Sequence, residues 1–331
     1  MIQKKNFKVL SIDGGGIKGL YSAYILKYIQ DDFGIDLHDY FDLFCGTSTG
    51  GIIALGLAKG VPIENIINFY EKRGPYIFPH KNIVTRFWGG IKQILLFGKY
   101  SNNELKKALE EVFEDLTIGD LEKQICIPAI RLSNQQVTVF KKDHSPNLSL
   151  HNEIPLVKVA LATSAAPTYF PIVKIEEAGN GYFVDGGIAV NDPSLIGAIE
   201  ASKYFVDREN NGKFDLLSIS SVGNNCGYSS IKFKRRWSVL WLLNLITLVS
   251  SVQSNTHYFS MKLLKDSLPC DNFIKIPSPD LSPKQRACIA MDLASNTALD
   301  TLELLAYDMW SLKKNDIELN QFFEQEVVKS K

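Results

Sequence analysis

Two stretches near the N-terminus share one pattern of apolar and small residues. Val9–Ile12 is a short apolar run that ends at three glycines, and apolar residues at helical spacing follow between Leu20 and Ile29. Phe41–Cys45 is a second such run, which ends at the small residues 46–51 and leads into the helical stretch Ile52–Lys59. Each stretch is typical of a strand, a tight turn and a helix. The repeated order predicts an α/β fold with a central, mainly parallel sheet and helices on its faces.

The rest of the chain continues this alternation. Ser101–Glu104 has the sequence of a capping box ahead of a helical stretch at 105–113, and the polar tail after Lys313 predicts a last, fraying helix. We find no linker rich in Pro or Ser, so one continuous domain is expected. Further strands are expected at 125–132, 137–141, 182–184, 216–219 and 273–276, and further helices near 155–165, 193–205, 238–264 and 283–312.

Composition and charge exclude several classes of protein. Of the 331 residues, 45% are hydrophobic and 22% are charged, so the chain can bury a core and is not disordered. The 36 Lys and Arg residues balance the 36 Asp and Glu residues, which argues against a partner that is a nucleic acid polymer.

Cysteine usage and hydropathy bear on the compartment. The five cysteines are scattered and include no Cys-x-x-Cys pair, so neither a disulfide framework nor a zinc ribbon is indicated. The apolar stretch before Asp13 is too short for a signal peptide. The most apolar window, 237–249, is shorter than the about 20 residues that a membrane span needs. These observations predict a cytoplasmic protein.

The first candidate site follows the strand at 9–12. Gly14, Gly16 and Gly19 satisfy G-x-G-x-x-G between a strand and a helix, which is the context of a dinucleotide-binding loop. The same glycines could form an oxyanion loop, whose N–H groups face a developing negative charge, or a plain tight turn. Lys18 opposes the helix dipole in the first turn, so it is either solvated or close to an anion. The pattern alone leaves these alternatives open.

The second candidate site is a G-x-S-x-G pattern made by Gly46, Ser48 and Gly50 at the next strand-to-helix turn. Such an elbow exposes the serine hydroxyl, and small neighbours let the backbone pass closely. The helix N-terminus stabilises negative charge at the same place. A phosphate-binding loop is the alternative, but the chain contains no G-x-x-x-x-G-K-[ST]. The context favours a serine nucleophile.

A serine nucleophile needs a base. The usual order on such an elbow places a histidine last, but the only late histidine, His257, lies inside a predicted helix. Asp185 is the better candidate, because it ends the strand at 182–184 and is followed by Gly186 and Gly187. Asp-Gly is also a common turn pair. Taken together, the three motifs predict a Ser–Asp dyad beside an anion-stabilising loop.

With these motifs in this order, the sequence resembles the patatin-like phospholipase family. The resemblance rests on Asp13–Gly19, on Gly46–Gly50, on Asp185–Gly187 and on Ala162–Pro171, which resembles the family's Ala-Ala-Pro-x-Tyr-Phe block. It implies a modified α/β-hydrolase fold whose catalytic core is residues 8–200. We expect residues 201–331 to continue the same domain. Asn191 and Pro193 are also as the family predicts.

The resemblance also implies roles for the motif residues. Ser48 would attack an ester of a membrane glycerophospholipid, and Asp185 would accept its proton. Backbone N–H groups would hold the oxyanion, and no cofactor or metal ion is expected, because no cluster of metal ligands appears in the sequence. The expected oxyanion residues are Gly14, Gly15, Gly16 and Thr49, and the other motif residues are Lys18, Gly19, Gly46, Gly50, Gly186 and Gly187.

Length and the C-terminal half resemble the bacterial patatin-like effectors of cyclic-oligonucleotide (CBASS-type) antiphage systems. This implies a cyclic di- or trinucleotide activator, leaves a homo-oligomer open, and places the activity at the inner membrane surface. Arg or Lys would hold the nucleotide phosphates; the sequence does not choose among Arg73, Arg86, Arg131 and Arg235. Two segments, 87–97 and 232–241, could approach a membrane or could be ordinary core or lid packing.

Other functions remain as alternatives at this point. One is a constitutive patatin-like lipase or esterase in lipid turnover, and another is a catalytically inactive binding protein on the same fold. A Rossmann-type dinucleotide-binding protein is more remote, because no acidic residue ends the second predicted strand.

Overall fold

The computed structural model describes residues 6–79, 100–145, 148, 150–207, 209, 212–223 and 238–324, without the side chains of 238–244 and 246. The segment 87–97, residues 232–237, His80, Cys226, Arg86 and Arg235 therefore lie outside the described residues, as does the side chain of Trp241.

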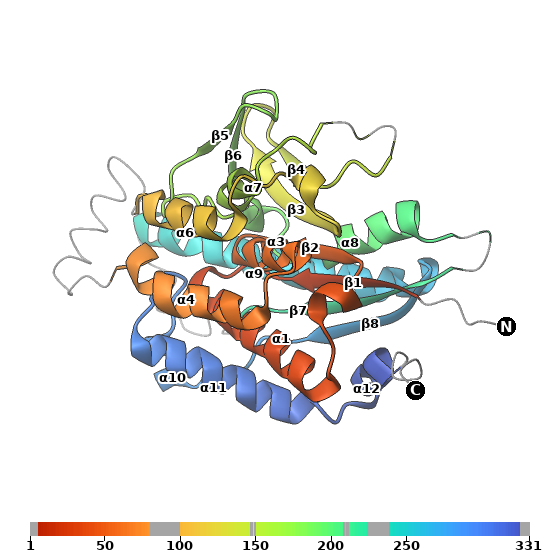
Figure 1. Cartoon of the computed structure of the whole chain (residues 1–331). Helices are drawn as coiled ribbons and strands as arrows, with labels where there is room; N and C mark the ends of the chain where they lie inside the picture. The colour runs from red at the N-terminus through yellow and green to blue at the C-terminus, as the bar shows by residue number, and fades with distance from the viewer. Residues whose placement is uncertain are drawn as a thin grey trace.

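An eight-stranded sheet forms the centre of the molecule (Figure 1). The strand order is β5-β6-β3-β2-β1-β7-β8, and β4 pairs with β3 outside this path. The pairs β1–β2, β2–β3, β1–β7 and β7–β8 are parallel, whereas β6 pairs antiparallel with both β3 and β5. The strands are β1 (Phe7–Ile12), β2 (Leu43–Gly46), β3 (Gln124–Arg131), β4 (Gln136–Phe140), β5 (Val173–Ile175), β6 (Gly181–Asp185), β7 (Phe214–Ile219) and β8 (Cys270–Ile276).

Helices cover both faces of this sheet, and α11 runs along α1 (Figure 1). The α-helices are α1 (Gly19–Phe33), α2 (Leu37–Tyr40), α3 (Thr49–Lys59), α4 (Ile63–Ile77), α6 (Asn103–Phe113), α7 (Leu156–Thr163), α8 (Ser194–Glu200), α9 (Ser238–Leu264), α10 (Pro283–Cys288), α11 (Asn296–Lys313) and α12 (Ile317–Glu324). Short 3-10 turns lie at Gly16–Lys18, Ile118–Asp120, Gly186–Ile188 and Lys265–Ser267, and a π-helical turn lies at Ala201–Phe205.

Alternate residues of the central strands enter two different cores. Leu10 and Leu217 pack with the larger cluster, which includes residues of α1, α3, α4 and α11, whereas Val9 and Leu216 pack with Ala198 of α8 in a smaller cluster. Successive side chains of a strand point to opposite faces. These strands are therefore buried on both sides, which explains their continuous apolar runs. The predicted fold class is confirmed.

Two local predictions were wrong. The helical run predicted at 283–312 is two helices, α10 and α11, because residues 289–295 leave the helix and Ser295 caps α11 by accepting from the Ala298 N–H. The capping box at 101–104 does not form, because Ser101 accepts from the nearer Asn103 N–H, and α6 begins at Asn103, two residues before the stretch predicted at 105–113. Helix α4 and strand β5 were not predicted from the sequence.

Three further observations concern the sequence expectations. Among the described cysteines, Cys45, Cys126, Cys270 and Cys288 are free. In the described part of the chain, no helix has both the length and the apolar character to cross a membrane. Strands β7 and β8 extend the sheet begun by β1, which supports our proposal that 201–331 continues the domain of 8–200.

Candidate active site

Ser48 lies at the tight turn between β2 and α3. Its backbone has φ 56° and ψ −124°, a strained conformation for a residue other than glycine and one that is concentrated at functional sites. The turn also needs its two glycines. A Cβ on Gly46 would lie 2.1 Å from the carbonyl oxygen of Gly50, and a Cβ on Gly50 would lie 2.3 Å from that of Ile12.

Thr163, at the end of α7, fixes the backbone of this turn. Its Oγ1 accepts a hydrogen bond from the Ser48 N–H at 3.0 Å and donates one to the Pro128 carbonyl at 2.7 Å. All of these groups are buried, so the hydroxyl satisfies two polar backbone groups at once. Thr163 had no role predicted from the sequence. The only signal was its position just before the Ala-Ala-Pro block.

Asp185 is the residue to which the Ser48 hydroxyl points. Ser48 Oγ donates a hydrogen bond to Asp185 Oδ2 at 2.7 Å, and the two residues are 6% and 4% exposed. Asp185 ends β6, and its other oxygen, Oδ1, accepts from the Gly187 N–H at 2.6 Å. Gly186 is held against β3, since a Cβ there would lie 2.4 Å from the Pro128 oxygen. The structure thus brings together the serine and the carboxylate that the sequence singled out.

The environment of Asp185 changes its acidity. Burial raises the pKa of its carboxyl from 3.8 to about 6, although the hydrogen bonds from Gly187 and Ser48 work in the opposite direction. A carboxylate with this pKa accepts a hydroxyl proton more readily than an ordinary aspartate, because its proton affinity lies closer to neutral pH.

His257 is placed elsewhere. Its Nδ1 lies 2.8 Å from the carbonyl oxygen of Asp192. Within the described residues, the Ser48 hydroxyl bonds to Asp185 and to no histidine. The geometry therefore favours the carboxylate over the histidine as the partner of Ser48.

The glycine loop after β1 lies against Ser48. A Cβ on Gly14 would lie 3.2 Å from the Ser48 Cβ, so the two residues are in contact. The Gly14 N–H donates to the Asn191 carbonyl at 3.1 Å, so the predicted donor role of Gly14 was wrong and this group braces the loop instead. The N–H groups of Gly15 and Gly16 have no partner within the described residues. The Thr49 N–H opens α3, where helix donors lack an intrahelical acceptor.

Met291 supports the same loop from the break between α10 and α11. Its carbonyl oxygen accepts the Ile17 N–H at 2.9 Å. It also lies so close to Gly16, which has φ +64°, that a Cβ there would be 2.2 Å from it. Gly19 is less tightly confined, since a Cβ there would lie 3.1 Å from the Thr49 Oγ1 and 3.2 Å from the Tyr70 hydroxyl. The sequence signal for Met291 was hidden, because it fell inside a predicted helix.

A buried ion network joins the ends of three elements around this loop. Lys275 of β8 lies 2.6 Å from Asp192, just before α8, and 3.6 Å from Asp13 at the end of β1. Burial raises the pKa of Asp13 to about 8, against the lowering effect of the Lys275 charge. Asn191 adds a hydrogen bond from its side chain to Ser254 of α9 at 2.8 Å.

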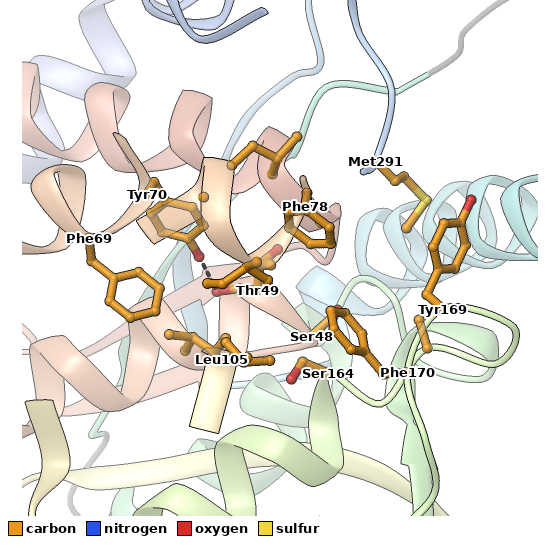
Figure 2. A pocket seen from close by; sticks show the side chains of 16 residues that line it. Ser48, Thr49, Phe69, Tyr70, Phe78, Leu105, Ser164, Tyr169, Phe170 and Met291 are labelled. Carbon is orange, nitrogen blue, oxygen red and sulfur yellow. Dashed lines mark hydrogen bonds between the residues drawn. The ribbon is translucent and has the colours of Figure 1, made fainter. Parts of the chain in front are cut away.

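An apolar cavity opens beside Ser48 (Figure 2). Its volume is about 40 Å³, which makes it narrow for an acyl chain in this conformation. The Tyr70 hydroxyl closes one wall by donating to the Thr49 carbonyl at 3.1 Å, the dashed contact in Figure 2. Its labelled lining residues are Ser48, Thr49, Phe69, Tyr70, Phe78, Leu105, Ser164, Tyr169, Phe170 and Met291.

Helix α4, which was not predicted, provides much of the wall of this cavity. Apolar residues at Ile63, Ile66, Ile67, Tyr70 and Ile77 have helical spacing and are buried. That periodicity was the available signal.

Comparison with known proteins identifies the family of this chain. Residues 10–196 match the family described as patatin-like phospholipase, and this chain belongs to that family. The glycine loop, the serine elbow and the Asp-Gly-Gly turn all fall inside the matched region. The family assignment decides against the Rossmann-type alternative.

Several relatives are similar along most of their length. A protein of Pseudomonas aeruginosa (strain BWHPSA011 / Pa011) named cGAMP-activated phospholipase is 32% identical over 297 residues, which cover 90% of this chain and 86% of that protein. A protein of the same name from Escherichia coli (strain TW11681) is 32% identical, with 91% and 88% covered. Patatin-like protein 2 of Oryza sativa subsp. indica is 30% identical, with 84% and 78% covered.

Proposed function

We propose that this protein is a phospholipase A-type lipid acyl hydrolase that cleaves ester bonds of membrane glycerophospholipids. The observation that carries the proposal is the buried hydrogen bond of 2.7 Å between Ser48 Oγ and Asp185 Oδ2. Ser48 also lines the apolar cavity, and an apolar cavity suits a fatty acyl chain. Membership of the family supports the same class of substrate.

In the proposed reaction, Ser48 and Asp185 act as a dyad. Asp185 takes the hydroxyl proton while Ser48 Oγ attacks the ester carbonyl, and the proton passes to the leaving alcohol as the tetrahedral intermediate collapses. Water then attacks the acyl enzyme, Asp185 takes a proton from that water, and the fatty acid leaves as Ser48 regains its proton.

The N–H groups of Gly15, Gly16 and Thr49 hold the oxyanion in this proposal. Those of Gly15 and Gly16 have no acceptor within the described residues. A preorganised donor of this kind typically contributes about 10²–10³ in rate. The helix dipole of α3 favours negative charge at the same point.

We also propose that a cyclic nucleotide activates the enzyme in antiphage defence, in the cytoplasm at the inner membrane surface. The names and similarity of the bacterial relatives support this part of the proposal. The second candidate is a constitutive patatin-like lipase of lipid turnover, since the plant relative is named patatin-like protein 2 and its name gives no activator. A homo-oligomer stays a prediction.

The test is the release of fatty acid from phospholipid vesicles, followed by mass spectrometry with and without cGAMP. The expected result is release by the wild-type protein, dependent on cGAMP, and none by Ser48→Ala. Ser202→Ala is the matched control, because Ser202 is a buried serine in the π-helical turn at Ala201–Phe205. Full activity without any nucleotide, unchanged by cGAMP and by a panel of other cyclic nucleotides, would favour the constitutive lipase.

A further inference from the structure

A second cavity shares the glycine loop but not Ser48. Its volume is about 380 Å³, within the usual range for small-molecule sites, and polar side chains from β8, α9 and the segment after β7 line it. The lining residues that matter here are Gly14, Gly15, Lys18, Ser221, Tyr258 and Lys275.

The position of this cavity in the sheet is typical of a ligand site. From β1, the chain places β2 on one side and β7 on the other, and all three strands run parallel. In open α/β sheets, ligands bind outside the carboxyl ends of the strands, where the strand order reverses. The cavity lies at this point, between the glycine loop after β1 and the residues 220–223 after β7.

Lys18 brings an unpaired positive charge to this cavity. The residue is only 6% exposed, and it forms no hydrogen bond or ion pair within the described residues. Burial lowers the pKa of its ammonium group to about 8. A buried charge without a partner is costly. An anion in the cavity would remove that cost. Because Lys18 is buried, it is not the solvated lysine that the sequence left as an alternative.

Two other polar groups in the cavity have no partner within the described residues. They are Ser221 Oγ and Asp13 Oδ1, which are buried and form no hydrogen bond there, and both residues line the cavity. Ser221 packs directly on the glycine loop, since a Cβ on Gly15 would lie 1.9 Å from its Oγ. Buried polar groups normally have a hydrogen-bond partner, and a polar ligand in the cavity would provide one for these two groups.

The described arginines offer no comparable site. Arg73 forms an ion pair with Glu111 on the surface, and Arg131 donates to the Gly179 carbonyl. Arg286 donates to the Leu281 carbonyl; its Nε has no partner within the described residues, but the residue lines neither cavity beside the glycine loop. Lys275 already pairs with Asp192 and Asp13. Lys18 is therefore the free cation that this part of the structure presents to a cavity.

We propose that this polar cavity binds the cyclic dinucleotide activator, with Lys18 and Ser221 holding one of its phosphodiester groups. The inference rests on the proposed function and adds the place of regulation. The ligand contacts Gly14 and Gly15 of the loop that supplies oxyanion donors at Ser48. It therefore acts by binding one arrangement of that loop more tightly than another.

A phospholipid headgroup carries the same phosphodiester chemistry, so the experiment separates the two sources. Binding of cGAMP is measured by calorimetry on the full chain carrying Ser48→Ala, in which no substrate is turned over. Lys18→Gln in that background should weaken binding about ten- to hundredfold, the effect of one charged hydrogen bond. Lys18→Arg should restore most of the affinity, and Ser221→Ala should weaken it by a smaller factor.

The matched control is Lys59→Gln. Lys59 is a half-buried lysine that lines a different cavity near the end of α3, and its removal should leave cGAMP affinity unchanged. In the Ser48-containing protein, activation is then followed on a short-chain neutral ester, which has no phosphate. The half-activating cGAMP concentration should rise in Lys18→Gln by the factor seen in calorimetry.

Three results would overturn the inference. One is unchanged cGAMP affinity in both Lys18→Gln and Ser221→Ala, which places the nucleotide elsewhere. The second is unchanged nucleotide affinity in Lys18→Gln with a raised KM for phospholipid only, which makes the cavity a headgroup site. The third is no cGAMP binding by the parent protein; fatty acid release from vesicles would then show that the hydrolase proposal survives while this one fails.

Discussion

The two cavities beside the glycine loop differ in size and chemistry. The cavity at Ser48 has a volume of about 40 Å³ and an aromatic and aliphatic lining, whereas the cavity at Lys18 has a volume of about 380 Å³ and contains polar groups that have no partner in the described part of the chain. Met291 lines both. One loop thus separates a site suited to an ester and its acyl chain from a site suited to an anion. The comparison suggests that chemistry and control meet at this loop.

The largest expected effect is on the dyad. Ser48→Ala and Asp185→Ala should each lower kcat for phospholipid by about 10⁴ or more, because each removes one half of a single catalytic unit. The double variant should be no slower than either single variant. Single-turnover assays with circular dichroism as the check of folding would measure this. Near-wild-type turnover by Asp185→Ala would remove the dyad from the account.

The second-largest effect on kcat should come from a substitution in the glycine loop that lies between the two cavities. Gly15→Ala places a methyl group where Ser221 now lies, at 1.9 Å from its Oγ, so the Gly15 N–H must shift. The expected loss in kcat is about 10²-fold, the scale of one oxyanion donor. Adding Ser221→Gly should recover part of the rate, because it frees that space. Equal losses in the single and double variants would show that the two cavities are not coupled through this contact.

A smaller effect should follow from narrowing the apolar cavity. Leu105→Trp adds bulk to the wall provided by α6, and we expect at least about a tenfold loss in kcat/KM for long-chain esters with acetyl esters little affected. The affinity for cGAMP should not change, because Leu105 does not line the polar cavity. A series of ester chain lengths measures the shift. Equal losses at all chain lengths would contradict an acyl role for this cavity.

The pH profile should report Asp185. Its pKa is raised to about 6 by burial, and only the ionised carboxylate accepts the Ser48 proton. We therefore expect kcat/KM on a neutral ester to be level above about pH 7, to be about half its maximum at pH 6 and to fall about tenfold by pH 5. A profile that stays level down to pH 4.5 would show that this carboxyl does not act as the base.

The smallest effect concerns stability. A raised pKa means that the folded state holds the Asp185 proton more tightly than the unfolded state does. The contribution of this group to the free energy of unfolding therefore decreases as the pH rises from about 4 to about 6. Asp185→Asn has no carboxyl group at this position and therefore does not undergo this pH-dependent loss of stability. Its free energy of unfolding should therefore gain about 1–3 kcal/mol relative to wild type between pH 4 and pH 7.5. Denaturant titrations at both pH values measure the gain, and a constant difference would contradict the shift.

Local sequence patterns were sufficient to predict those site residues that lie at a single strand-to-turn junction. The ends of β1, β2 and β6 could be predicted because an apolar run meets glycines there, and these ends carry Gly14–Gly16, Ser48 and Asp185. Thr163 could not be given its role, because its contacts with Ser48 and Pro128 join distant segments.

The burial of Lys18 and the position of Met291 escaped the sequence for the same reason. Lys18 in the first turn of a helix looks the same whether the next layer of structure covers it or not, and only the folded chain shows that it is 6% exposed. Met291 sits in a stretch whose apolar spacing continues the helical pattern, yet its carbonyl is used by the Ile17 N–H. Tertiary contacts override local pattern in both cases.

The most direct test of the account is fatty acid release from phospholipid vesicles by wild type and by Ser48→Ala, each with and without cGAMP. The account predicts that mass spectrometry detects free fatty acid and lysophospholipid only for wild type with cGAMP, because release needs both the Ser48–Asp185 pair and the activator. Equal release by Ser48→Ala, or no release by wild type with cGAMP or any other cyclic nucleotide, would contradict it.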